Sequence, residues 1–118
     1  MSKTGIVELI EAGLRAEGLR QRAIANNVAN LQTPGYRRLD IKFEQLLAKA
    51  IESGGEFDLE ELEPEVYQPK TTAIKPNGND VNLEAEVGDM VKNNLRQKAL
   101  IRVLNKKYSQ IDQAVNNR

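Results

Sequence analysis

The chain has 118 residues and a formal net charge of zero, so it forms at most one ordinary domain. Balanced charge argues against a dedicated binder of nucleic acid or of an anionic membrane. The sequence contains no His and no Cys, which excludes disulfides, thiol chemistry, imidazole catalysis and the usual zinc sites. We therefore predict no enzyme, no metal and no cofactor.

The first residues carry acidic side chains where a cleaved signal peptide needs an apolar core. No apolar run approaches the roughly 20 residues of a membrane-spanning helix. We expect no cleaved leader and no membrane span, while an uncleaved, receptor-read export signal stays open.

The N-terminal segment, residues 1–32, is predicted to form an amphipathic helix. Its apolar residues recur at alternating steps of three and four, which is the narrow stripe of a coiled-coil seam. Glu17 and Gln21 occupy the two positions that would complete the series. Gly13 and Gly18 either weaken a solvated face or allow a second helix to approach closely. The stripe consists of Val7, Ile10, Leu14, Ile24, Val28 and Leu31.

This helix runs into a cluster of asparagines and then stops. Pro34 lacks the N–H of a helical residue, and Pro34 with Gly35 suits the centre of a type II turn, where glycine takes the positive φ. Asparagine is a poor choice inside a helix, because its side chain competes for backbone hydrogen bonds. We therefore expect that the amides of this cluster are used in specific bonds. The cluster consists of Asn26, Asn27 and Asn30.

The middle segment, residues 33–80, is expected to connect two long helices. Its pattern favours a short extended stretch near residue 41 and a short helix over residues 43–51. Six carboxylates crowd residues 56–65 without the internal glycine of a calcium loop, so we expect a solvated linker without regular structure. Residues 64–76 favour extended chain, such as a hairpin or an edge strand. Arg37 and Arg38 are expected on the surface.

The C-terminal segment, residues 81–118, gives the clearest helix prediction. Asp80 or Asn82 can serve as N-cap. An unbroken four-three repeat then extends over a rod of roughly 50 Å. Leu95, Ala99 and Val103 widen this stripe on one side. The apolar positions of the repeat are Leu83, Val87, Met90, Ile101, Leu104, Tyr108, Ile111 and Val115.

The predicted fold is mainly α. Long N- and C-terminal helices form an antiparallel coiled coil, with an irregular, β-containing middle segment, and together they make one elongated domain. The middle segment is too short and too polar to cover both helices, so their stripes must also meet another chain. Self-association or filament packing is the favoured function, and a coiled-coil adaptor that recognises one partner helix is the alternative.

Two separated segments resemble one known family. The run from Ala25 to Asn30, followed by Thr33-Pro34-Gly35-Tyr36, resembles the N-terminal signature of bacterial flagellar rod, hook and hook-associated proteins. Residues 79–84, residues 94–100 and the C-terminal heptad helix are similar to those of the short proximal rod members of that family.

The resemblance implies a structural subunit of the proximal rod of the flagellar basal body, or an adjacent short rod subunit. Such a subunit polymerises with other axial proteins to form the drive shaft that transmits motor torque. The implied partners are further copies, other rod proteins, the inner-membrane ring with its junction protein, and the flagellar type III export apparatus. The implied location is the rod in the periplasm, reached without a cleaved signal. The resemblance also implies subunit contacts through Asn26, Asn27, Asn30, Thr33, Pro34, Gly35 and Tyr36.

Overall fold

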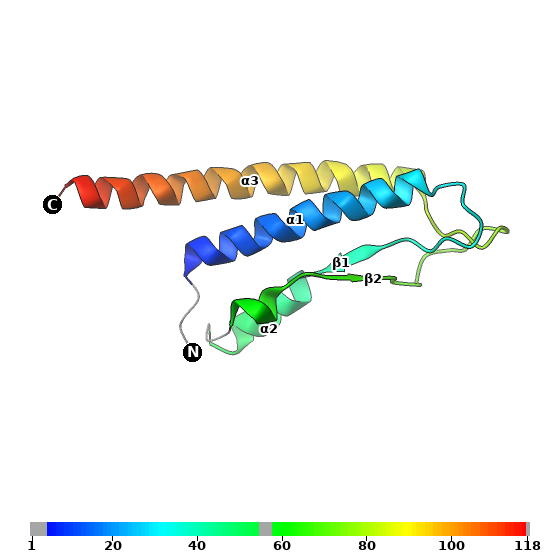
Figure 1. Cartoon of the computed structure of the whole chain (residues 1–118), viewed down its shortest axis with the longest axis horizontal. Helices are drawn as coiled ribbons and strands as arrows, with labels where there is room; N and C mark the ends of the chain where they lie inside the picture. The colour runs from blue at the N-terminus through cyan, green and yellow to red at the C-terminus, as the bar shows by residue number, and fades with distance from the viewer. Residues whose placement is uncertain (1–4, 55–57, 118) are drawn as a thin grey trace.

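Two long helices lie antiparallel along the length of the molecule (Figure 1). Helix α1 spans Ile6–Ala29 and helix α3 spans Leu83–Asn116. The computed structural model describes residues 5–54 and 58–117. The molecule measures 66 × 27 × 16 Å along its principal axes, so it is an elongated rod, as predicted. None of the helices in the described ranges has the length and apolarity needed to cross a membrane.

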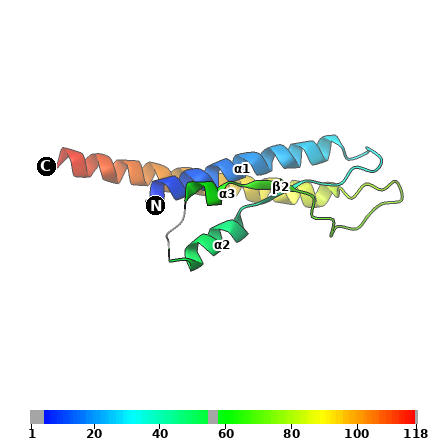
Figure 2. The same cartoon turned by 60° about the horizontal axis from the view of Figure 1, so that its bottom comes forward.

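The middle of the chain forms a second layer along α1 (Figure 2). Strand β1, Asp40–Lys42, pairs antiparallel with strand β2, Glu65–Tyr67, and Ile41 lies opposite Val66. Helix α2, Glu44–Glu52, follows β1 directly. The short extended stretch, the short helix and the later extended segment therefore form where the sequence predicts them.

The acidic segment departs from its prediction. Residues Leu59–Leu62 form a 3-10 turn, η1, instead of a linker without regular structure. Leu62 is fully buried and fills part of the space between α1 and α2. The carboxylates around it remain exposed, as predicted. Glu56 lies outside the described residues.

The hydrophobic core is small and sits between α1 and the second layer. It contains small residues on the α1 side, which let the layer approach closely, and larger side chains opposite them. Leu9 and Leu47 pack against its edge. The core residues are Ala12, Ala16, Phe43, Ala50 and Leu62.

Helix α3 begins with a conventional cap. The Oδ1 atom of Asn82 accepts a hydrogen bond from the backbone N–H of Ala85 at 2.9 Å, so Asn82 and not Asp80 is the N-cap. Glu84 lies in the first turn, next to the positive end of the helix dipole. The last turns of α3 run past Ile6, the first residue of α1, and are exposed (Figure 1).

The helices meet along a seam that differs from the predicted stripe of α3. Glu86 and Asn93 are the buried residues of α3, and Leu100 lies opposite Gly13 of α1. The seam keeps a seven-residue repeat of its own, through Glu86, Asn93 and Leu100 and through Met90, Gln97 and Leu104. The seam therefore shares one side of the predicted stripe, while the other side of the stripe lies on a flank of α3 that is turned away from α1.

The two predicted stripes consequently have different surroundings. In α1, Ile10 and Ile24 are buried and the rest of the stripe is half-buried where α1 and the following turn are covered. In α3, only Met90 and Leu104 of the predicted apolar positions are half-buried. The remaining positions are exposed, namely Leu83, Val87, Ile101, Tyr108, Ile111 and Val115.

Candidate functional site

The predicted motif lies at the end of the molecule where α1 stops and α3 starts. Gly35 has φ of 76°, as the type II turn requires, and the N–H of Tyr36 closes the turn on the carbonyl of Thr33. The N–H of Gly35 also donates to the carbonyl of Asn77 at 2.9 Å. A Cβ atom on Gly78 would lie 3.3 Å from the Gly35 Cα, so the two turns pack backbone against backbone.

Asn27 is the centre of this end. Its side chain is fully buried and makes four hydrogen bonds. The Nδ2 group donates to the carbonyl of Leu39 at 2.9 Å and to Oε1 of Glu86 at 2.8 Å. The Oδ1 atom accepts from the N–H of Leu39 and from the hydroxyl of Tyr36, both at 2.8 Å. Asn27 thus joins α1, the segment after the turn and α3.

The other two asparagines of the motif have smaller roles. Asn26 donates through Nδ2 to the Tyr36 hydroxyl at 2.8 Å. Asn30 donates through Nδ2 to the carbonyl of Asn26 and accepts from the Thr33 hydroxyl, which closes the end of the helix. All three amides are therefore used within the chain. Asn26 and Thr33 keep exposed surface, as do Pro34 and Gly35.

The second motif segment completes the network from the other side. Buried Asn79 donates through Nδ2 to the carbonyls of Asn30 and Thr33, both at 2.8 Å. Its Oδ1 atom accepts from the N–H of Val81 at 2.7 Å. The two sequence segments that carry the family resemblance therefore form one hydrogen-bonded structure.

Arg37 and Arg38 are half-buried and make ion pairs, so they are less exposed than the surface position expected for them. Arg37 Nε donates to Oδ2 of the buried Asp80 at 3.0 Å, and the N–H of Arg38 donates to its Oδ1. Arg38 Nε reaches Oε2 of the buried Glu86 at 3.0 Å. Two buried carboxylates near the start of α3 recruit these cations, because an unpaired buried charge is unstable.

These bonds also perturb two ionisable groups. Burial alone would raise the pKa of Asp80, but the hydrogen bonds and charges of Arg38 and Arg37 outweigh it and hold that pKa below its ordinary value. Burial raises the pKa of the Tyr36 hydroxyl. Tyr36 therefore stays neutral and keeps its proton for Asn27.

A second polar cluster lies halfway along the helices. Arg20 donates to Glu17 at 2.7 Å and to Glu44 of α2 at 2.8 Å. Arg96 of α3 reaches the same Glu17 oxygen at 3.1 Å. Asn93 Nδ2 donates to Gln21 at 2.7 Å. Glu17 and Gln21, the two polar interruptions of the N-terminal stripe, are thus the residues that pair across the helices.

This arrangement positions helices and carries no catalytic geometry among the residues that the structure describes. In the same ranges, no group of three or more acidic, His or Cys side chains is placed to hold a metal ion. We call the hydrogen-bonded end around Asn27 and Asn79 the closed end of the molecule. The closed end, together with the polar cluster around Glu17 and Arg20, instead fixes the register of α1 against α3, as buried polar pairs do in coiled coils.

Comparison with known proteins identifies the family of this helical hairpin. A profile of the family described as "Flagella basal body rod protein" matches residues 11–37, which include the asparagine cluster and the turn. The flagellar basal body rod protein FlgB of Bacillus subtilis is 25% identical over 117 residues, which cover 92% of this chain and 91% of the relative. The chain therefore resembles the flagellar basal body rod proteins named FlgB.

Two further relatives carry the same name. FlgB of Aeromonas hydrophila is 27% identical over 108 residues, with 81% of each chain covered. FlgB of Borreliella burgdorferi is 28% identical over 95 residues, which cover 65% of this chain and 70% of the relative. The likeness to the Bacillus subtilis protein extends through the middle segment, beyond the two terminal motifs seen in the sequence.

Several residues of the closed end cannot be assigned from the sequence of this rod protein. Its pattern predicts Glu86 only as a complement to the helix dipole, but Glu86 is the buried partner of Asn27 and Arg38. Asn79 stands out in the sequence only as part of a motif, and Asp80 only through that motif and as a candidate N-cap. A usable signal exists: polar residues concentrate on both sides of the predicted chain reversal, where two helix ends must meet.

Proposed function

We propose that this chain is a structural subunit of the proximal rod, which polymerises with other axial proteins to form the drive shaft that transmits motor torque. The observation that carries the proposal is the uncovered apolar stripe of α3 in a FlgB-like chain. Exposed apolar surface of this extent is typical of an interaction site. The stripe includes Val87, Ile101, Ile111 and Val115, all exposed.

The stripe suits packing in a bundle of neighbouring subunits. In a bundle, α3 would pack on α1 along one side of the stripe and on a neighbouring subunit along the exposed side. The protein would thereby contact further copies and other rod proteins. The inner-membrane ring, its junction protein and the type III export apparatus are proposed partners on the family resemblance, as is a periplasmic location reached without a cleaved signal.

The closed end supplies a second proposed contact. Asn27 is saturated by bonds within its own chain, so its role is to hold the turn in place. Thr33, Pro34 and Gly35 present the exposed edge of that turn. We assign the contact with a neighbouring subunit to this edge and to Asn26.

The test is complementation of a strain that lacks the gene. The wild-type chain should restore motility and appear in purified basal bodies. Ile111→Asp should fold, because Ile111 is exposed in the monomer, but should fail to enter basal bodies, since the charge would be buried against a neighbour. Ser109→Asp, an exposed position outside the stripe, is the matched control and should behave as wild type.

Complete basal bodies in the deletion strain would contradict the proposed function. Normal incorporation of Ile111→Asp would contradict the role of the stripe.

A further inference from the structure

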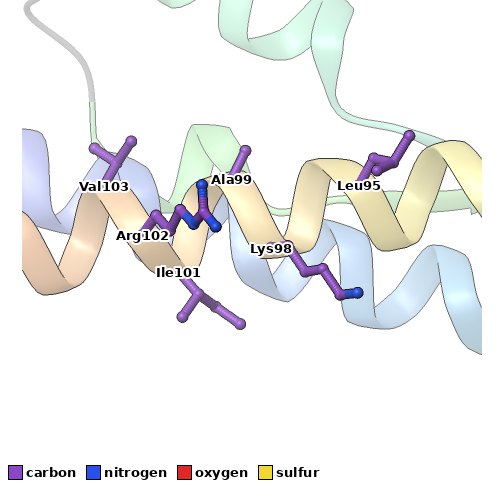
Figure 3. Close-up of a pocket in the computed structure, with 6 residues that line it drawn as sticks. All are labelled: Leu95, Lys98, Ala99, Ile101, Arg102 and Val103. Atoms are coloured by element: carbon purple, nitrogen blue, oxygen red, sulfur yellow. The ribbon is translucent and has the colours of Figure 1, made fainter.

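The face of α3 that is turned away from α1 combines apolar and basic side chains. Leu95, Ala99 and Val103 form the apolar floor of a shallow hollow along one edge of α3, and Arg102 lies beside them (Figure 3). Lys98 and Ile101, which also line the hollow, project from the opposite edge. Leu95 has 63% of its surface exposed and Val103 has 44%. We call this surface the outer face of α3.

The outer face cannot be part of the contact with α1. Leu100 lies against Gly13 of α1, and residues two positions away on a helix are rotated by about 200°. Lys98 and Arg102 therefore project on the side of α3 opposite Leu100. Lys106 stands in the same relation to Leu104, which is half-buried. These three cations are spaced by four residues, so they form a row about 12 Å long.

No described residue pairs with this basic row. The other cations near the seam behave differently: Arg20 and Arg38 reach carboxylates, and so does Arg96. The row is thus an unmatched positive surface on a chain whose formal net charge is zero.

The matching negative surface lies on η1 and the residues beside it. Leu62 anchors this turn in the core and leaves the surrounding carboxylates exposed. From residue 60 to residue 65 the chain advances about 14 Å, at about 2 Å per residue in the turn and about 3.3 Å in extended chain. That length fits the basic row. We call these residues the acidic turn: Asp58, Glu60, Glu61, Glu63 and Glu65.

The acidic turn and the outer face belong to different sides of one molecule. Turn η1 packs on α1 and α2, whereas the outer face is turned away from α1 (Figures 1 and 3). No ion pair joins the acidic turn to α3 within the described residues. The complement of each surface is therefore available only on another molecule.

We propose that the acidic turn of one copy docks on the outer face of α3 of a second copy. Lys98, Arg102 and Lys106 meet the carboxylates, and the docked turn covers the apolar floor. The contact joins two different surfaces, so it is heterologous and can propagate into a helical assembly. This proposal rests on the proposed function, because it names one contact by which such a subunit would polymerise.

Engineered cysteines test the contact directly, because the natural chain has none. Purified Glu61→Cys and Arg102→Cys chains are mixed at low ionic strength and oxidised. The matched control replaces Glu61→Cys by Lys75→Cys, which is exposed on the loop before α3. We expect a mixed disulfide dimer at least tenfold more abundant than in the control mixture, and less of it at 1 M salt.

A second experiment exchanges the charges of the two surfaces. Glu61→Lys alone and Arg102→Glu alone should each lose association with the wild-type chain, while a mixture of the two variants should recover it. A mixed disulfide no more abundant than the control, or no recovery in the exchanged pair, would overturn the proposal. A disulfide within a double-cysteine monomer would overturn it as well. Incorporation of the wild-type chain into basal bodies is measured separately, so the proposed function can stand if this contact fails.

Discussion

Asn27, near the end of α1, and Glu86, near the start of α3, are both fully buried and are joined by a 2.8 Å hydrogen bond. They are 59 residues apart in the sequence. The bond joins the motif at the end of α1 to the first turns of α3 and closes the hairpin. Each partner is in turn fully engaged, Asn27 with Leu39 and Tyr36, and Glu86 with Arg38.

Asn27→Leu should destabilise the hairpin strongly. The substitution leaves Oε1 of Glu86 and the backbone groups of Leu39 without their wild-type partner, and each unpaired buried group costs about 1–3 kcal/mol. Asn26→Leu removes one exposed bond and should change stability by less than about 1 kcal/mol. Thermal unfolding followed by circular dichroism compares the two, and equal melting temperatures would contradict the central role of Asn27.

Substitution by alanine should affect stability differently at the two glycines of α1. A Cβ atom added at Gly18 would meet only open space, so Gly18→Ala should gain about 1 kcal/mol of helix propensity. At Gly13 a Cβ atom would lie 3.3 Å from Leu100 Cδ1, so part of the same gain should be lost in moving Leu100. Chemical denaturation should give Gly18→Ala a higher free energy of unfolding than Gly13→Ala. The reverse order would show that α3 does not approach α1 at Gly13.

Leu62→Ala should lower stability by about 2–5 kcal/mol, because it opens a cavity where α1, α2 and η1 meet. Glu61→Ala, next to it and exposed, should change stability by less than about 0.5 kcal/mol. Urea denaturation measures both. A small effect of Leu62→Ala would mean that the acidic turn is not part of the packed structure.

Asp80 should contribute to acid sensitivity. Its pKa is lowered in the folded state by Arg37 and Arg38, so its stabilising effect is complete above the unfolded value of about 3.9. The effect is lost as the pH falls through the lower folded pKa. The melting temperature of wild type should therefore drop more steeply below about pH 4 than that of Asp80→Asn. Parallel curves of melting temperature against pH for the two proteins would show that Asp80 does not contribute to the acid sensitivity.

Much of the fold follows from local signals. The periodicity of the terminal segments predicts α1 and α3, and the proline with Gly35 predicts the turn, which has the expected positive φ. Helix α2, Glu44–Glu52, forms within one residue of the predicted range 43–51. These features depend on neighbouring residues in the sequence, where propensity and turn geometry act directly.

The features that the sequence does not reveal depend on contacts between distant segments. Phe57, Leu59 and Leu62 all interrupt the carboxylates in the sequence, and only the space between α1 and α2 explains the burial of Leu62. Arg38 is buried in part because Glu86 lies opposite it, 48 residues later. The four-three repeat of α3 is correct as a pattern, but α3 packs on α1 through only one side of it, so most of its apolar positions face away from α1.

The central claim is that this chain is a rod subunit whose α3 stripe is covered by neighbours. An electron cryo-microscopy map of basal bodies purified from the organism that carries the chain tests it most directly. The account predicts that the hairpin of α1 and α3 fits the proximal rod density, with Ile101, Ile111 and Val115 packed against helices of adjacent subunits. A rod density that has no place for this hairpin, or one in which those side chains face open solvent, would contradict it.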